Sequence, residues 1–237
     1  MLTKKEFITS DGLEILHLVM CSCPDSPTNG GREAKLILKK FSEMKTDIDF
    51  ARFSESMNAW KKKYAEHADS CLLDALYDVY AHIKEVSGLT VDGISIIHFF
   101  SGQHHAEKIW AEILNEHGKD WGMIYARKVL FAHMLVVMRI ESIEGDRVHG
   151  VYEDGENIIT MRNVLSFSDD LQPHDVVLVH YGFVLKKASK KESENTLRGN
   201  FHSGLFSETR KLIRDNGIDF EDMHYFPRSL KIAKGEI

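Results

Sequence analysis

The sequence is poor in cysteine and in proline, and each shortage excludes a class of protein. Its 237 residues include three cysteines and four prolines. Three cysteines, an odd number, do not make the disulfide framework of a small secreted domain, so we expect a reducing, cytoplasmic setting. The few prolines and the hydrophobic fraction of 43% argue against long disordered segments. We therefore expect a folded chain with enough apolar material for one large or two small domains.

Long apolar runs and net positive charge are also missing. A membrane-spanning helix needs roughly 18–20 apolar residues in a row, and no run in this sequence approaches that length. The opening residues, MLTKKEFITSDG, lack the apolar core of a signal peptide. The formal net charge of −6 provides no general attraction for nucleic acid. We therefore expect neither a membrane span nor a nucleic-acid partner.

The sequence motifs of the common enzyme classes are missing as well. There is no glycine-rich phosphate loop, no nucleophile elbow, no HExxH zinc motif and no cysteine–histidine pair at catalytic spacing. We therefore lean against an enzyme and assign no catalytic residue.

What the sequence does contain is the pattern of a small β-barrel. In LQPHDVVLVHYGFVL, residues 171–185, four apolar residues follow a turn signal and predict a buried strand. Gly182, between two aromatic residues, indicates a bulge, a bend or a close backbone contact. Shorter strands are predicted over residues 135–143, 147–152 and 157–161, with acidic, glycine-containing turns between them. Short strands at this spacing are typical of OB or SH3 barrels.

Helical patterns precede the predicted barrel. Apolar residues at helical spacing predict helices between residues 32 and 88, and again over residues 103–118 and 120–133. Residues 91–100 fit either a strand or the start of a buried helix. After the barrel, a capping box at residues 189–192 predicts a further helix. The last predicted helix, over residues 207–216, is amphipathic.

Together these patterns predict an α+β protein. We expect a mainly α-helical domain over residues 1–130, of no recognised family. An OB/SH3-like β-barrel domain follows over residues 131–197, and a C-terminal helix and tail occupy residues 198–237.

The barrel region also carries a resemblance to a known family. Three pieces stand in order: IEGD at residues 143–146, DVVLVHYGF at residues 175–183 and KESENTL at residues 191–197. They resemble the HypC/HupF family of hydrogenase-maturation chaperones, whose corresponding pieces read roughly I-x-G-D, G-D-[YW]-V-L-V-H-x-G-F-A and E-E-x-E-E-T-L. The resemblance covers about residues 133–197, and it predicts a HypC-like barrel.

The resemblance implies an accessory, chaperone-like protein in metal-centre assembly, most closely in [NiFe]-hydrogenase maturation. Such a protein would dock on a hydrogenase subunit or on a maturation factor, and His180, Gly182 and Phe183 are the expected partner-binding residues. In the family, a cysteine at the start of the domain is implied to hold an iron fragment bearing cyanide and carbonyl ligands, which suits a soft thiolate.

The position equivalent to that cysteine falls near His133, and no cysteine is close to it in sequence. Imidazole also binds iron. His133 is therefore either a metal ligand in place of cysteine or an ordinary linker residue, and iron is the implied cofactor.

A second hypothesis places a metal in the helical domain, at His98, His104 and His105. Adjacent residues on a helix do not face each other, so His104 and His105 cannot both point at one ion without distortion. His98 and His104 are then the candidate ligands, and the protein would be a metal- or cofactor-binding enzyme or sensor with the barrel as a docking module. A third hypothesis is a purely structural partner module that has kept the fold and lost the metal chemistry.

Overall fold

The structure divides into two compact units, and mainly the second is described. It is a computed structural model that describes residues 92–117, 120–166 and 168–223, together with residues 9, 11, 12, 15 and 19. Contacts between residues group the chain into residues 1–96 and residues 97–237. In the first unit, the carboxylate of Asp11 accepts a hydrogen bond from the amide of Gly93 at 3.1 Å. The helices predicted between residues 32 and 88 lie outside the described residues.

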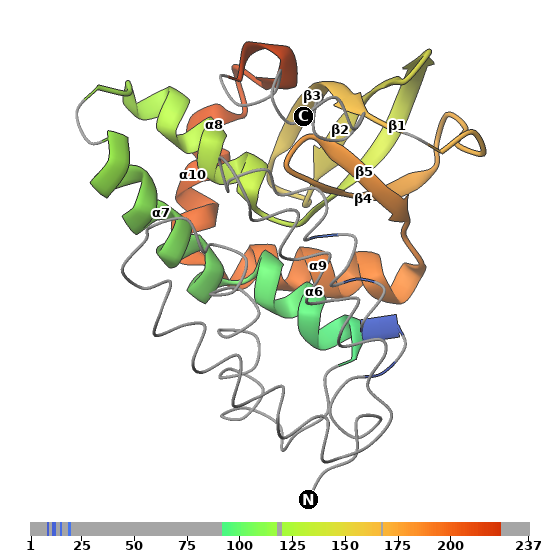
Figure 1. Ribbon diagram of the computed structural model, residues 1–237, viewed down its shortest axis with the longest axis horizontal. Helices are drawn as coiled ribbons and strands as arrows, with labels where there is room; N and C mark the ends of the chain where they lie inside the picture. The colour runs from blue at the N-terminus through green and yellow to red at the C-terminus, as the bar shows by residue number, and fades with distance from the viewer. Residues whose placement is uncertain are drawn as a thin grey trace, which may run out of the picture. The chain divides into compact units, whose positions relative to one another are not determined.

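Five strands form a closed β-barrel in the second unit (Figure 1). They are β1 (Val136–Glu144), β2 (Arg147–Glu153), β3 (Ile158–Leu165), β4 (Val176–His180) and β5 (Phe183–Lys187). They hydrogen-bond in the order β2-β1-β4-β5-β3, and β3 pairs back with β2 to close the ring. A short strand, β6 (Ile218–Asp219), pairs with the middle of β3. The predicted small barrel within an α+β fold is confirmed in this unit.

The strand pairings around the barrel differ in length. β2 pairs with β1 and β3 in long antiparallel ladders, whereas β3 and β5 are parallel and pair only at Leu165 and Phe183. The Leu165 amide donates to the carbonyl oxygen of Gly182 at 2.8 Å. Gly182 has a φ of 82°, a left-handed conformation that glycine adopts without steric cost. The bend predicted at this glycine is therefore the tight turn between β4 and β5.

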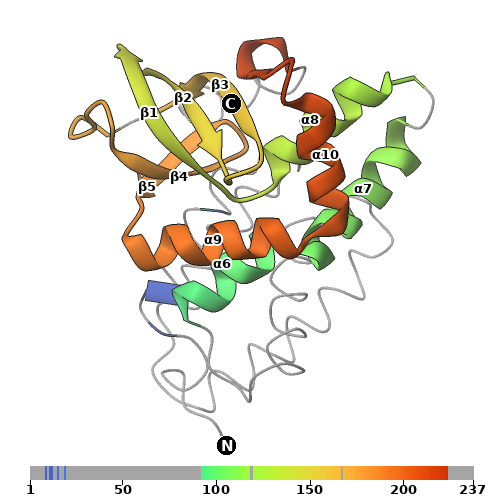
Figure 2. The ribbon, with the colours of Figure 1, turned by 180° about the vertical axis from the view of Figure 1, so that it is seen from behind.

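The apolar core of the barrel continues into two helices, α8 (Met123–His133) and α10 (Gly204–Ile213). These helices lie side by side in Figures 1 and 2. Phe131 of α8, Tyr152 of β2 and Phe206 of α10 meet there, with ring centroids between 5.3 and 6.4 Å apart. Burying each such side chain contributes about 1.5–3 kcal/mol to stability. The helices are thus part of the barrel's own folding unit.

Three further helices lie between residues 92 and 223: α6 (Gly93–Ser101), α7 (Gln103–His117) and α9 (Lys190–His202), with a short 3-10 turn η1 (Phe220–Asp222). The segment that fitted either a strand or a helix is therefore helical. The domain boundaries expected after residues 130 and 197 fall within α8 and α9, and the two compact units meet at residue 96. Within the described ranges, no helix combines the length and the apolar character that crossing a membrane requires.

Serine caps fix where the last two helices begin. The capping box of α9 is confirmed: the Ser189 hydroxyl oxygen accepts from the Glu192 amide at 3.2 Å, and the Glu192 carboxylate accepts from the Ser189 amide at 2.7 Å. The C-terminal helix was expected from residue 207 but begins at Gly204. The reason is Ser203, whose hydroxyl oxygen accepts from the Phe206 amide at 3.3 Å and starts α10 one turn earlier.

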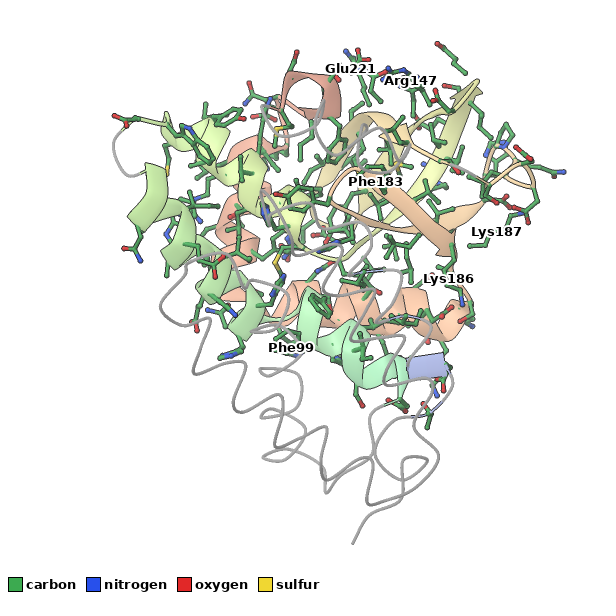
Figure 3. All side chains as sticks on the ribbon, in the orientation of Figure 1. Phe99, Arg147, Phe183, Lys186, Lys187 and Glu221 are labelled. Carbon is green, nitrogen blue, oxygen red and sulfur yellow. The ribbon has the colours of Figure 1, made fainter. Side chains whose placement is uncertain are left out.

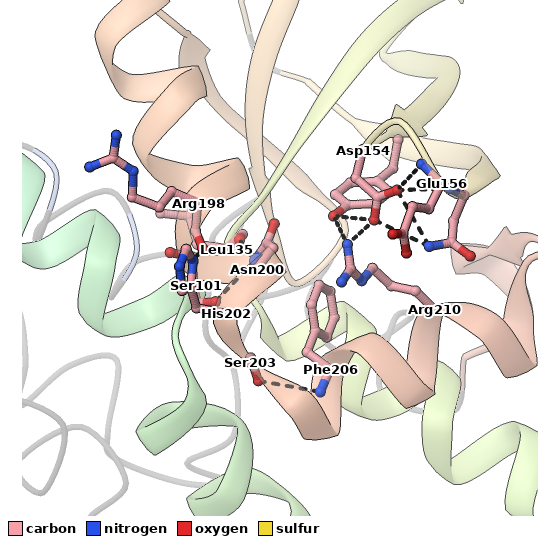
Figure 4. Close-up of polar contacts among 12 residues, drawn as sticks. Ser101, Leu135, Asp154, Glu156, Arg198, Asn200, His202, Ser203, Phe206 and Arg210 are labelled. Atoms are coloured by element: carbon pink, nitrogen blue, oxygen red, sulfur yellow. Dashed lines mark hydrogen bonds and ion pairs between the residues drawn. The ribbon is translucent and has the colours of Figure 1, made fainter.

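A buried amide ties α9 to the segments that lead into the barrel (Figure 4). Asn200 Nδ2 donates to the carbonyl oxygens of Ser101, at the end of α6, and of Leu135, just before β1, at 3.0 and 3.1 Å. Leu135 in turn donates its amide to the carbonyl oxygen of Phe100 at 3.0 Å. Because buried backbone groups need partners, these bonds hold the end of α6 against the α8–β1 junction.

Candidate functional site

Three buried histidines come together at one end of the barrel. His105 lies on α7, His133 is the last residue of α8 and His180 is the last residue of β4. Their exposed fractions are 6%, 6% and 2%. The amide of Tyr181 donates to the carbonyl oxygen of Ala132 at 2.7 Å, which brings the turn after β4 against the end of α8. We refer to His105, His133 and His180 as the histidine cluster.

Aromatic rings surround the histidine cluster. The Phe100 ring makes edge contacts with His105 and with His180, at centroid distances of 5.0 and 6.0 Å. The Tyr181 ring lies 4.2 Å from that of His133 and 6.0 Å from that of His180. Apolar rings on these sides keep water away and strengthen any electrostatic interaction inside.

Backbone carbonyls determine which nitrogen of two of these rings carries the proton. His133 Nδ1 lies 2.7 Å from the carbonyl oxygen of Val129, and His105 Nε2 lies 3.2 Å from that of His133. A carbonyl oxygen only accepts, so both nitrogens are assigned as N–H donors. The lone pairs then reside on His133 Nε2 and His105 Nδ1. His105 Nδ1 is buried and has no hydrogen-bond partner in the described structure.

Burial keeps His105 neutral. The largest influence on its pKa is desolvation, which lowers it well below 6.5, and positive charge on His180, His133 or Lys108 would lower it further. The hydrogen bond to the carbonyl of His133 acts in the opposite direction and is the smaller effect. His105 is therefore an uncharged base at neutral pH.

We expect the free energy of unfolding to fall as the pH drops below about 6.5, because the unfolded chain then protonates His105 and the folded chain does not. The slope from one such histidine reaches about 1.4 kcal/mol per pH unit. Urea denaturation at about pH 7.5 and about pH 5 measures it. His105→Leu should make the dependence on pH shallower, and an unchanged dependence in that variant would contradict the assignment.

The two other histidines predicted as metal ligands have different surroundings. The His98 ring is hydrogen-bonded through Nε2 to the side-chain oxygen of Asn195 at 2.8 Å. His104 is exposed, with its ring 6.0 Å from that of Phe99. Of the residues predicted to bind metal, the structure brings only His133 into the histidine cluster. The metal-binding roles of all three stay predictions.

The residues predicted to bind a partner are buried in this chain. His180, Gly182 and Phe183 all lie below the surface. Figure 3 shows Phe183 within the barrel, at the opposite end of β5 from Lys186 and Lys187. A role in partner binding stays a prediction for these residues. Inside the protein, the His180 ring contacts the rings of Phe100 and Tyr181.

The burial of His105 could have been predicted from the spacing of apolar residues in the sequence. On α7 the buried residues include Ile109 and Ile113, which follow His105 at intervals of four. Residues spaced in this way share one helix face, so His105 belongs to the buried face and His104 to the exposed one. The prediction that paired His98 with His104 used only their separation in the sequence, and it did not separate the buried face of α7 from the exposed one.

The donor set of the histidine cluster determines what it can hold. Among the residues that the structure describes, no group of three or more histidine, cysteine, aspartate or glutamate side chains stands ready to bind a metal ion. Imidazole nitrogens with lone pairs suit iron, nickel, copper and zinc. The histidine cluster is therefore not a preformed three-ligand metal site. No protein-family model, curated protein or solved structure matches this chain.

Proposed function

We propose that this protein is an accessory, chaperone-like protein of metal-centre assembly, most closely in [NiFe]-hydrogenase maturation. The observation that carries the proposal is the contact between His133 and the turn after β4, where the Tyr181 ring lies 4.2 Å from that of His133. The resemblance of residues 133–197 to the HypC/HupF family involves the same two segments. His133 stands near the position of the family's iron-binding cysteine, and His180 stands at the histidine of the family's V-L-V-H-x-G-F piece. The two segments are far apart in sequence and adjacent in the fold.

In this proposal, His133 and His180 hold an iron fragment. This fragment, an iron ion that would carry cyanide and carbonyl ligands, is what the protein would deliver to the hydrogenase. The Val129 carbonyl orients His133 so that Nε2 is the ligand nitrogen. Phe100 and Tyr181 exclude water from this side of the cluster. Because the chain contributes only a few imidazole ligands, the fragment remains transferable.

Burial of the turn after β4 changes the role we assign to His180. A side chain with 2% exposure contributes little to a docking surface. We therefore assign His180 to the carried fragment. Docking on the hydrogenase subunit or maturation factor would then use the surface around the β4–β5 turn.

We expect protein purified without oxygen from its native host to contain roughly stoichiometric iron and to show cyanide and carbonyl bands in its infrared spectrum. His133→Ala and His180→Ala should each remove the bands, because each deletes a ligand. His149→Ala is the matched control, since His149 is a partly buried barrel histidine on β2 outside the cluster. It should keep both bands and iron.

The opposite results separate the alternatives. Iron or zinc without those bands, removed by changing His98 or His104, would favour a metal-binding enzyme or sensor built on the helices. A metal-free protein that forms a stable complex with another subunit would favour a docking module without metal chemistry. Either result would overturn the proposed carriage of an iron fragment.

A further inference from the structure

His149 on β2 lies opposite an irregular point of β3. The pairing between the two strands shifts register between Val148 and Gly150, on either side of this histidine. Across from it, Asn163 of β3 has a φ of 57°, a left-handed conformation that is uncommon outside glycine. The backbone amide of Asn163 donates to His149 Nδ1 at 3.3 Å. The imidazole ring therefore supplies an acceptor for an amide at a bulge in the barrel wall.

Asn163 also contacts the last described elements of the chain. Its side-chain Nδ2 donates to Asp219 Oδ1 at 2.7 Å. Asp219 belongs to β6, which pairs with β3. The same oxygen accepts from the Glu221 amide at 3.1 Å and so begins η1. One hydrogen-bonded path thus runs from the His149 ring through Asn163 to β6 and η1.

The bond to the Asn163 amide requires a neutral His149. A backbone amide only donates, so Nδ1 is assigned the lone pair and Nε2 the ring proton. Nε2 is buried and has no hydrogen-bond partner among the described residues. A protonated imidazole is a donor at both nitrogens, so Nδ1 could no longer accept from the amide. Asn163 would then keep its left-handed conformation at the cost of an unpaired amide.

The charges around His149 supply a partner for the protonated ring. The carboxylate of Glu144, on β1, lies 4.0 Å from His149 Nε2, and it would attract a charged imidazole. The other charged residues at this part of the wall are Glu141 on β1, Arg147 on β2, Arg162 on β3, Asp219 on β6 and Glu221 on η1. Each of these has a neighbour of opposite charge, so Glu144 is the carboxylate that remains for the ring.

We propose that His149 is an acid-sensitive latch that holds β6 and η1 against β3. Imidazole changes its charge between about pH 5 and about pH 8. Above this change, the neutral ring binds the Asn163 amide. Below it, the charged ring turns toward Glu144, Asn163 leaves its left-handed conformation, and the bond from its side chain to Asp219 is lost. The latch works independently of the histidine cluster and of any metal.

The test is an NMR titration of the full-length protein between about pH 7.5 and about pH 5.5. Ring spectra report the protonation of His149, and amide spectra report the backbone and side-chain amides of Asn163. We expect all of these resonances to change with one midpoint. The hydrogen-exchange protection of the Asn163 backbone amide, corrected for the intrinsic effect of pH, should fall by about fivefold, which corresponds to one hydrogen bond.

Two variants isolate the ring of His149. His149→Asn should abolish the coupled change, because its side-chain oxygen can accept from the Asn163 amide at every pH. The matched control is His174→Asn, which removes an exposed histidine from the turn before β4. It should leave the coupled change as it is in the unchanged protein.

Three results would overturn the inference. Asn163 resonances that stay constant while His149 takes up its proton would show that the ring and the bulge are not coupled. A ring that stays neutral throughout the titration would remove the trigger. The same coupled change in His149→Asn would assign it to another group. None of these readouts involves iron, so the infrared experiment decides the proposed function separately.

Discussion

Replacing Arg210 by methionine is expected to lower the free energy of unfolding by about 3–5 kcal/mol, because it leaves a buried carboxylate without its partner. Arg210, on α10, has 1% exposure and forms an ion pair with Asp154, whose side chain is 3% exposed. Arg210 Nη1 also donates to the Tyr152 hydroxyl at 2.9 Å. Figure 4 shows Arg210 reaching from α10 to the turn that holds Asp154.

Neutral donors remain at Asp154 but do not replace the lost positive charge: the Tyr152 hydroxyl and Asn157 Nδ2 each donate to its second carboxylate oxygen at 3.3 Å. Burial raises the pKa of Tyr152 above its ordinary value, so it stays a neutral phenol. One oxygen of Asp154 already accepts from the amides of Glu156 and Asn157, at 3.0 and 2.7 Å, and so maintains the turn after β2. The expected loss therefore combines an uncompensated charge with a loosened contact between α10 and the barrel.

Urea denaturation of Arg210→Met beside Arg214→Met measures this effect. Arg214 follows α10 directly, and its ion pair with Asp215 is exposed, so its replacement should change stability by less than about 0.5 kcal/mol. Adding Asp154→Asn to Arg210→Met should cost less than the sum of the single changes, because both charges then leave together. Equal, small effects at positions 210 and 214 would show that the buried pair does not stabilise the fold.

Gly150→Ala is expected to destabilise the protein by about 3 kcal/mol, through steric overlap in the barrel wall. A Cβ at this position on β2 would lie 2.3 Å from the Arg139 carbonyl oxygen and 2.9 Å from Met138 Cγ. The carbonyl belongs to β1, which pairs with β2 across a register shift at this point. It cannot retreat without lengthening the ladder between the two strands.

The control for crowding is Gly204→Ala at the first residue of α10. Apart from its chain neighbours and the backbone of its own helix, no described atom lies within 4 Å of the added carbon there, and alanine favours helix over glycine. We therefore expect unchanged or slightly higher stability for Gly204→Ala in the same thermal or urea measurement. A Gly150→Ala variant as stable as Gly204→Ala would mean that the β1–β2 wall has room to move.

The barrel could be predicted from the sequence because its signals are local. Turn residues and short apolar runs located β1, β2 and β4 to within a few residues. The parallel contact between Leu165 and Phe183 has no local signal, because the register of parallel strands depends on the rest of the fold. For the same reason, residues 91–100 stayed open between strand and helix: a short apolar run supports both.

The site could be predicted only in part. His133 and His180 were selected through the resemblance, and their proximity depends on the bond between Tyr181 and Ala132, which no periodicity reveals. The apolar spacing on α7 indicates which face of the helix is buried, and it places His105 on that face. Arg210 gave no signal of its own, since an arginine on an amphipathic helix ordinarily faces water.

The short pairing between β3 and β5 gives the barrel a seam. Opening the ring there breaks little more than the contact between Leu165 and the Gly182–Phe183 turn, whereas opening it between β2 and β3 would break a long ladder. Proteins open locally where the fewest stabilising contacts are lost. His180 is the last residue of β4 and pairs with Phe183 across this turn. An opening between β3 and β5 would therefore loosen the barrel wall next to His180, while the long ladders on both sides of β2 stay paired.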